Sequence, residues 1–373
     1  MSPEVHIKEE IIPEEKPIYV ASQWKLMWLK FKKHKLALTG GTIIIVFYLL
    51  AIFCEFFSPY DIQRRTTYIY CPPTKIHFID GGGKFYIRPF VYKIKSELDT
   101  QTFRWIYTED KSQKYFIKFF CREDEYKFWG LFRTNIHLFG VNEGYIFLFG
   151  TDSLGRDLFS RTISASRISL SIGLVGVFLS LIIGSLLGGI SGYSGGTVDI
   201  VIQRIIEFFT SMPTLPLWMA LSAALPPTWP QVKVYFGITI ILSLIGWCGV
   251  ARVVRGRTLQ MKEEDYIMAA KITGVSSFRI IATYLVPGCL SYLIVSLTLS
   301  IPSMILGETS LSFLGLGLRP PAVSWGILLQ DAQKINTLAN CPWLLIPGVF
   351  VFIVVLAFNF LGDGLRDAAD PYR

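Results

Sequence analysis

Residues 168–192 read ISLSIGLVGVFLSLIIGSLLGGISG. No charged side chain interrupts this stretch, and it is longer than the roughly 20 apolar residues that a helix needs to cross a bilayer. Of the 373 residues of the chain, 51% are hydrophobic and only 17% are charged, whereas soluble domains carry about 25% charged residues. The sequence therefore predicts a polytopic membrane protein rather than a soluble domain.

Five other uncharged runs are long enough to cross a membrane. They cover residues 36–54, 208–224, 234–251, 280–307 and 343–362. Of the run 280–307, the membrane part is expected to begin near Tyr284. The first run follows a basic segment, as in a signal peptide, but it is too long and no small-residue cleavage site follows it, so we expect a retained anchor. The predicted fold is all-α and polytopic, with six transmembrane helices.

The basic residues predict the orientation of these helices. The segment before the first run carries Lys25, Lys30, Lys32, Lys33 and Lys35, and the loop after residue 251 carries Arg252, Arg255, Arg257, Lys262, Lys271 and Arg279. Because basic residues collect in cytoplasmic loops, both termini are predicted to be cytoplasmic. Three arginines before residue 168 fall on the other side, but they end a long loop, and long loops translocate largely regardless of charge. The same distribution explains the net charge of +8, and no nucleic-acid partner is expected.

Residues 58–150 differ from the rest of the chain in composition. Stretches such as KFYIRPFVYKI and TFRWIYTED alternate polar and apolar residues, and DGGGK is typical of a turn. We expect a small β-rich extracytoplasmic insertion of unassigned role. Cys71 and Cys121 lie in it, and whether they form a disulfide is left open. The six cysteines contain no CxxC pair and the four histidines are scattered, so no metal site is expected.

The predicted domains are therefore a cytoplasmic tail at 1–35, a first transmembrane helix at 36–57, the insertion at 58–150 and a five-helix core at 151–373. Within the core, glycines of the second run, such as Gly173, Gly176 and Gly184, are expected to allow close helix packing.

A polar segment, EEDYIMAAKITGVSSFRIIATYLVPG at 263–288, separates two of the most hydrophobic runs. In a helix, Tyr266, Ala270 and Gly274 stand four residues apart, and they share a face with Ala269 and Thr273. This face has little bulk, so it suits docking into a groove of a partner protein. The alternative is an amphipathic connector on the lipid surface, which would favour bulky apolar residues.

The ends of this helix are also marked in the sequence. Three acids at 263–265 favour a helix N-terminus, Gly274 is suited to end the helix, and Ser276 or Ser277 is suited to cap the next one. The prediction is a helix–turn–helix on the cytoplasmic membrane surface, within a coupling segment at 258–287. Pro287 would join it to the following transmembrane helix.

The sequence MAAKITG, with Pro287 thirteen positions after its last residue, resembles the EAA loop of ATP-binding-cassette importer permeases. Met268 stands where that motif often has glutamate, a position that varies in the peptide-transport branch. Segments 148–173, 192–217, 307–329 and 363–373 resemble, in the same order, parts of the C-type permease subunits of the dipeptide, oligopeptide and nickel branch. The resemblance covers residues 24–60 and 147–373 and leaves the insertion unexplained.

The resemblance implies a type I importer core whose coupling segment docks on an ATPase subunit through Tyr266, Ala269, Ala270, Thr273 and Gly274, with Pro287 passing the motion on. It implies as partners a second, B-type permease subunit, two ATPase subunits, a solute-binding protein, membrane lipid and a peptide substrate. It places the chain in the bacterial inner membrane. The chain has no GxxxxGK[ST] loop; in DGGGKF, phenylalanine follows the lysine. We therefore expect no catalytic residue and no cofactor of its own, with ATP and Mg²⁺ bound by the partners.

Breaks in the apolar runs suggest where a translocation path could lie. Pro213, with Ser211 and Met212, and Pro302 are expected to break helices, and such breaks are tolerated where protein or a water-filled path satisfies the backbone. Each proline could instead mark a packing kink. Glu308, at the end of a run, is either solvated at the interface or a path-lining charge that meets a peptide amine.

Two other classes of function are weighed against a permease. An intramembrane enzyme would need a catalytic or metal-binding cluster, but no histidine falls within an apolar run. A receptor or scaffold would have no use for the coupling segment. Within the permease family, the cargo is left open between peptides and an opine, a metal chelate or an oligosaccharide.

Overall fold

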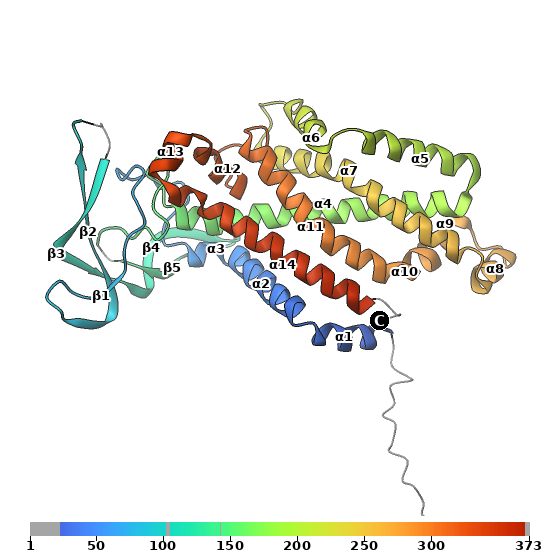
Figure 1. Ribbon diagram of the computed structural model, residues 1–373, viewed down its shortest axis with the longest axis horizontal. Helices are drawn as coiled ribbons and strands as arrows, with labels where there is room; N and C mark the ends of the chain where they lie inside the picture. The colour runs from blue at the N-terminus through green and yellow to red at the C-terminus, as the bar shows by residue number, and fades with distance from the viewer. Residues whose placement is uncertain (1–22, 102–104, 142, 370–373) are drawn as a thin grey trace, which may run out of the picture.

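The computed structural model describes residues 23–101, 105–141 and 143–369. Long helices lie side by side, and the β-strands stand together at one end of the bundle (Figure 1). Among the described residues, five helices are long and apolar enough to cross a membrane. They are α2 (Lys35–Ile52), α4 (Leu158–Ser194), α7 (Gln231–Met261), α11 (Leu290–Phe313) and α14 (Ile346–Ala369). The predicted polytopic helical fold with a β-rich insertion is confirmed.

The third predicted span, 208–224, is not a single helix. The chain forms α5 (Gly196–Ser211) and then α6 (Thr214–Ala223), which follow one another along the bundle (Figure 1). Met212 between them is extended, with ψ of 141°. Proline has no amide hydrogen and disfavours helical conformation in the residue before it, so Pro213 ends α5. The predicted break at Pro213 is therefore confirmed: α5 and α6 together stand where the third predicted span lies.

The helices α4 and α7 approach one another through a row of glycines. A Cβ atom added at Gly184 would lie 2.6 Å from the Cβ of Val250, and one added at Gly188 would lie 2.5 Å from the carbonyl oxygen of Ala251. Gly192 repeats the pattern one turn on, with Thr258 Cβ at 2.7 Å. Spacing by four residues places the three glycines on one face of α4, and only hydrogen fits there. The predicted close packing is confirmed at Gly184 and at Gly173, where an added Cβ would lie 2.8 Å from Ile305 Cγ1, whereas at Gly176 it would make only ordinary contacts, at 3.6 Å.

A second core lies around Trp325, at the start of α12 (Trp325–Gln330). The indole is fully buried, and its Nε1–H donates to the carbonyl of Thr162 in α4 at 3.1 Å. Phe47 of α2 packs edge-on against it, with ring centroids 6.2 Å apart. At the start of α2, α1 (Gln23–Lys33) packs against α14. The helix α1 and the end of α14 therefore lie together on the half of the bundle away from the strands (Figure 1).

The insertion contains the predicted strands. In one sheet, β1 (His77–Ile79), β2 (Phe85–Leu98) and β3 (Trp105–Phe116) pair antiparallel in that order. The predicted DGGGK turn joins β1 to β2. The strands β4 (Lys118–Phe128) and β5 (Phe132–Gly140) form a separate hairpin, and the short helix α3 (Cys54–Phe57) contacts β5. Cys71 and Cys121 are both buried thiols and are not joined by a disulfide.

The three arginines before residue 168, which do not fit the cytoplasmic preference of basic residues, lie close to carboxylates. Arg156 Nε donates to Asp152 at 2.7 Å, and Arg161 lies 3.5 Å from the same carboxylate, both nearly buried. Arg167 donates to both carboxylate oxygens of Glu55, at 2.5 and 2.7 Å. The helix α4 begins at Leu158, ten residues before the predicted apolar run, where the side chain of Asp157 caps it by accepting the N–H of Ser160 at 2.8 Å.

Candidate functional site

The coupling segment lies at the end of the bundle opposite the strands (Figure 1). It forms α8 (Asp265–Ile272), a turn, and α9 (Ser277–Ile280), so the predicted helix–turn–helix is present. The chain then passes through a π-helical turn at Ile281–Leu285 and α10 (Val286–Gly288) into α11. The segment thus joins the cytoplasmic-side end predicted for α7 to the start of α11 by short, hydrogen-bonded pieces.

Gly274 ends α8, as predicted. Its φ is +80°, a conformation that side chains other than glycine rarely adopt. Its N–H donates to the carbonyl of Lys271 at 3.1 Å, and the N–H of Val275 donates to the carbonyl of Ala270 at 3.1 Å. This pair of bonds is a Schellman motif. Ser276 stands at the N-cap of α9 but its side chain makes no capping hydrogen bond.

The predicted docking face is wrong at Ala270. This residue is only 8% exposed and packs in a small core with Ile267, Ile280, Ile281 and Leu285. The sequence analysis placed Ala270 on the face of Tyr266 because the two are four residues apart. In the structure, Ala270 lies on the same side of α8 as Ile267, three residues before it, and α9 folds back over that side. Tyr266, Ala269, Thr273 and Gly274 are exposed, as expected of a docking face.

The exposed side of the segment is bulkier than the sequence argument assumed. We define the coupling patch as four large apolar side chains that face outwards: Tyr266 at 48% exposure, Met268 at 46%, Ile272 at 83% and Phe278 at 66%. Lys271 and Arg279 are exposed among them. Apolar groups of this size concentrated on a solvent-facing turn mark a surface that another molecule covers.

The segment packs closely against the ends of the transmembrane helices. A Cβ atom at Gly189 of α4 would lie 2.6 Å from Ile281 Cγ2, and one at Gly288 would lie closer still to the side chain of Met261 at the end of α7. Pro287 lies in α10 and is exposed. It cannot donate to the preceding turn, and the wider π-helical turn comes immediately before it. The pieces that follow α8 therefore contact α4 and α7 directly and lead into α11.

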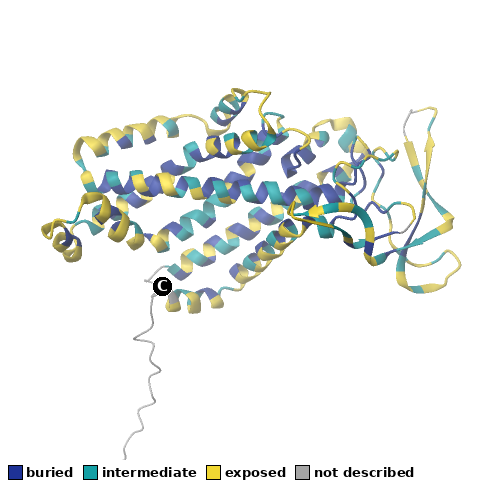
Figure 2. Cartoon of the chain, turned by 180° about the vertical axis from the view of Figure 1, so that it is seen from behind, coloured by how far each residue is buried: buried dark blue, intermediate teal, exposed yellow. Residues whose placement is uncertain are grey.

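The five residues predicted to line a path do not come together. Ser211, Met212 and Pro213 are exposed at the break between α5 and α6, whereas Pro302 and Glu308 are buried in α11. The expectation that Pro302 breaks its helix is wrong, because α11 continues through it. Figure 2 shows exposed residues along most of α5, in contrast to the buried side of the helices behind it.

Glu308 is neither solvated at an interface nor facing an open path, so both expectations for it are corrected. It is fully buried, and it accepts hydrogen bonds from Ser312 Oγ at 2.7 Å and Ser169 Oγ at 3.3 Å. Ser169 Oγ also accepts the backbone N–H of Trp325 at 3.2 Å. The carboxyl group therefore links α4, α11 and the start of α12. The spacing of four between Glu308 and Ser312 was the only signal of this in the sequence.

Substituting Glu308 by alanine should lower the stability of the subunit. Two buried serine hydroxyls would lose their acceptor and a cavity would open, which together cost about 2–4 kcal/mol. We expect a clear fall in the midpoint of thermal unfolding of the purified chain in detergent. Glu308→Gln keeps an acceptor and most of the volume, so it should lose much less; equal losses for the two variants would contradict this account.

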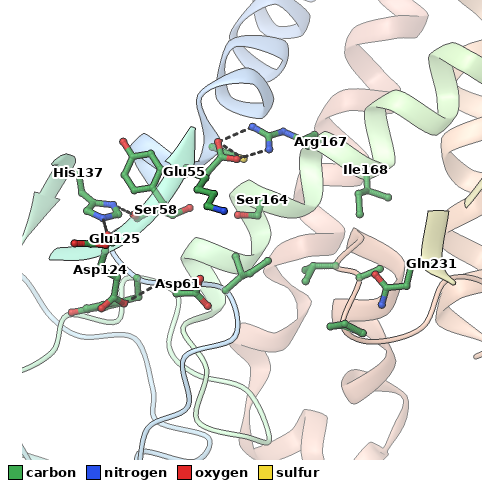
Figure 3. A pocket seen from close by; sticks show the side chains of 18 residues that line it. Glu55, Ser58, Asp61, Asp124, Glu125, His137, Ser164, Arg167, Ile168 and Gln231 are labelled. Atoms are coloured by element: carbon green, nitrogen blue, oxygen red, sulfur yellow. Dashed lines mark hydrogen bonds and ion pairs between the residues drawn. The ribbon is translucent and has the colours of Figure 1, made fainter. Parts of the chain in front are cut away.

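A cavity of about 490 Å³ lies where the insertion meets the helices, and no pattern in the sequence indicated it. Figure 3 shows Glu55 and Arg167 at one side and His137, Asp124 and Asp61 at another. Two of its acids are ion-paired: Arg64 Nη1 donates to both oxygens of Asp124, at 2.9 and 3.0 Å, and Arg167 pairs with Glu55. The described residues hold no group of three or more potential metal ligands. We therefore interpret this cavity as part of the interface between the insertion and the helical core, and not as a metal site.

Comparison with known proteins identifies the family. The model described as the inner membrane component of binding-protein-dependent transport systems matches residues 184–372, and the N-terminal transmembrane domain of oligopeptide transport permease C matches residues 22–73. The chain belongs to this permease family. The dipeptide transport permease DppC of Bacillus subtilis is 31% identical over 92% of this chain and 84% of its own length.

Two further relatives agree. The oligopeptide permease OppC of Bacillus subtilis is 32% identical over 94% of this chain and 90% of its own length, and OppC of Haemophilus influenzae is 43% identical over 61% of this chain and 71% of its own length. The permease is therefore the membrane subunit of a transport system, and the family implies ATPase and binding-protein partners.

Proposed function

We propose that this permease carries dipeptides or oligopeptides across the cytoplasmic membrane by alternating access, with ATP hydrolysed by separate subunits. The support for peptide cargo is that the curated relatives covering most of the chain are named as dipeptide and oligopeptide permeases. The single structural observation behind the coupling mechanism is the coupling patch, exposed on a segment that is packed against three transmembrane helices.

In this proposal the coupling patch docks in a cleft of an ATPase subunit. Tyr266, Ala269, Thr273 and Gly274 are contact residues, and Ala270 supports them from the core beneath. Closure of an ATPase dimer would shift α8, and the π-helical turn and Pro287 would pass the shift to α11. ATP and Mg²⁺ would bind to the ATPase subunits and not to this chain.

The other partners follow from the placement of exposed surfaces. The exposed side of α5, with Ile200 at 59% and Phe208 at 58% exposure, and the break at Ser211–Pro213 would face the second permease subunit across the path. The solute-binding protein would deliver cargo on the side of the insertion. The packing of α1 against α14 agrees with termini on one side, which we assign to the cytoplasm.

The proposal is tested by transport in proteoliposomes that contain the complete complex and its binding protein. A labelled tripeptide should accumulate only with ATP, and unlabelled peptides should compete, whereas a nickel chelate, an opine or an oligosaccharide should not. Mass spectrometry of the ligand held by the binding protein gives an independent answer. A non-peptide ligand there, together with no competition by peptides, would overturn the cargo assignment.

A further inference from the structure

The turn of the β4–β5 hairpin lies against the end of a transmembrane helix. Trp129 Nε1–H donates to the carbonyl of Ile52, the last residue of α2, at 3.1 Å. The adjacent ring of Phe128 stacks on Phe53, with centroids 5.8 Å apart. In Figure 1, β4 and β5 stand beside α3 at this end of α2, whereas the sheet of β1, β2 and β3 stands further out. The turn is thus held at the level where the membrane-spanning part of α2 ends.

The hairpin tip, which we define as residues 127–133, reads KFWGLFR. Three large apolar side chains in it are unusually exposed: Trp129 at 59%, Leu131 at 76% and Phe132 at 70%. Lys127 and Arg133 flank them and face one another across the strands. Neither makes an ion pair with a residue in the part of the chain that the structure describes. Apolar and aromatic groups bordered by basic residues are typical of segments at a membrane interface.

The turn itself does not explain the tryptophan. Trp129 and Gly130 both have positive φ, +53° and +73°, and the N–H of Leu131 donates to the carbonyl of Phe128 at 2.9 Å. Turns of this kind favour asparagine or glycine at both positions, and a bulky residue there is strained. The indole is fixed by its bond to Ile52 while more than half of its surface is left uncovered, which points to a role outside the turn.

The exposed surface of the tip continues the lipid-facing surface of the helices. Trp129 lines a largely apolar groove of about 490 Å³ between α2 and α4, together with Tyr48, Leu170 and Leu174. Along α2, Ile45 is 61% exposed, as expected for a side chain in contact with lipid. Trp129 therefore joins the tip to the apolar surface of α2 and α4.

We propose that the hairpin tip is a membrane anchor of the insertion. Its three exposed apolar side chains enter the boundary between headgroups and acyl chains in the leaflet on the insertion's side. Its two basic residues contact lipid phosphate groups, which attract basic residues close to an anionic surface. The hairpin has only two strands, which are marginally stable alone, so contact with the membrane also fixes how the insertion stands on the core.

The test measures the depth of the tip in vesicles of phosphatidylcholine and phosphatidylglycerol that contain the full chain with its co-purifying subunits. Leu131→Cys, labelled with bimane, should be quenched severalfold more by lipid carrying a doxyl group at carbon 5 than by aqueous iodide. The matched control is Ile87→Cys on β2, 90% exposed and in the other sheet, which iodide should quench preferentially. Protein without an added cysteine gives the labelling blank, and Phe132→Cys provides a second probe.

Quenching by iodide at residue 131 as strong as at residue 87 would place the tip in water and overturn the proposal. Protection from both quenchers would mean that a protein partner covers the tip, and would overturn it equally. Combining Lys127→Ala with Arg133→Ala should reduce lipid quenching at Leu131→Cys and leave Ile87→Cys unchanged; unchanged quenching at both sites would refute the contact with lipid phosphate.

Discussion

Replacing Gly188 with leucine should abolish the folded subunit. A single added carbon would already lie 2.5 Å from the carbonyl oxygen and 2.9 Å from the Cα of Ala251, both backbone atoms that cannot turn aside. The leucine therefore forces α4 and α7 apart along a contact that includes Gly184 and Gly192. Overpacking costs about 1–3 kcal/mol even where side chains can adjust, so we expect a loss of about 3 kcal/mol or more.

The measurement is the yield of monodisperse protein extracted from membranes and its thermal unfolding midpoint. Gly249→Leu is the matched control, because Gly249 also lies in a transmembrane helix, α7, but nothing is within 4 Å of an added Cβ. We expect near-normal yield and stability for this control. Similar behaviour of the two variants would show that the close approach of α4 and α7 is not needed for the fold.

Replacing Ile272 with aspartate should detach the ATPase subunit and leave this chain folded. Ile272 is 83% exposed, so the subunit loses almost no packing. If the coupling patch is buried in an apolar cleft, the carboxylate is left unpaired there, and loss of a central contact costs 2 kcal/mol or more. That corresponds to about 30-fold weaker association. ATPase co-purification and ATP-driven transport should fall together.

The control for this variant is Ile87→Asp, the same change at a 90% exposed isoleucine of the insertion, which should keep the ATPase bound. Ala270→Trp is a poor test of docking, because its side chain would enter the core formed with Ile267 and Leu285 and disrupt the segment itself. Retention of the ATPase by the Ile272 variant, and also by Phe278→Asp, would refute the docking surface.

Local features of the candidate site followed from the sequence alone. Gly274 ends α8 because a left-handed residue is needed to close the Schellman motif, and that requirement involves only neighbouring residues. The break after Ser211 was likewise predicted from Pro213, which has no amide hydrogen and disfavours helical conformation in the residue before it. The motifs around residues 268–274 and in the C-terminal half indicated the permease family, which the comparisons confirmed.

The directions of side chains did not follow from the sequence. Whether Ala270 faced a partner or its own subunit depended on how α9 folds back, and Glu308 was buried because Ser169, far away in the chain, reaches it. The cavity at the joint and the position of Trp129 beside Ile52 likewise depend on contacts between distant segments.

The sequence by itself determined that the chain spans a membrane and roughly where, because in hydrocarbon each backbone polar group must be satisfied within its own helix, and an uncharged run of sufficient length records this directly. Only the tertiary structure decided which faces of those helices meet, which polar groups they enclose and which apolar groups they leave exposed. Those outcomes depend on how separate helices and strands pack against one another, and no local pattern encodes them.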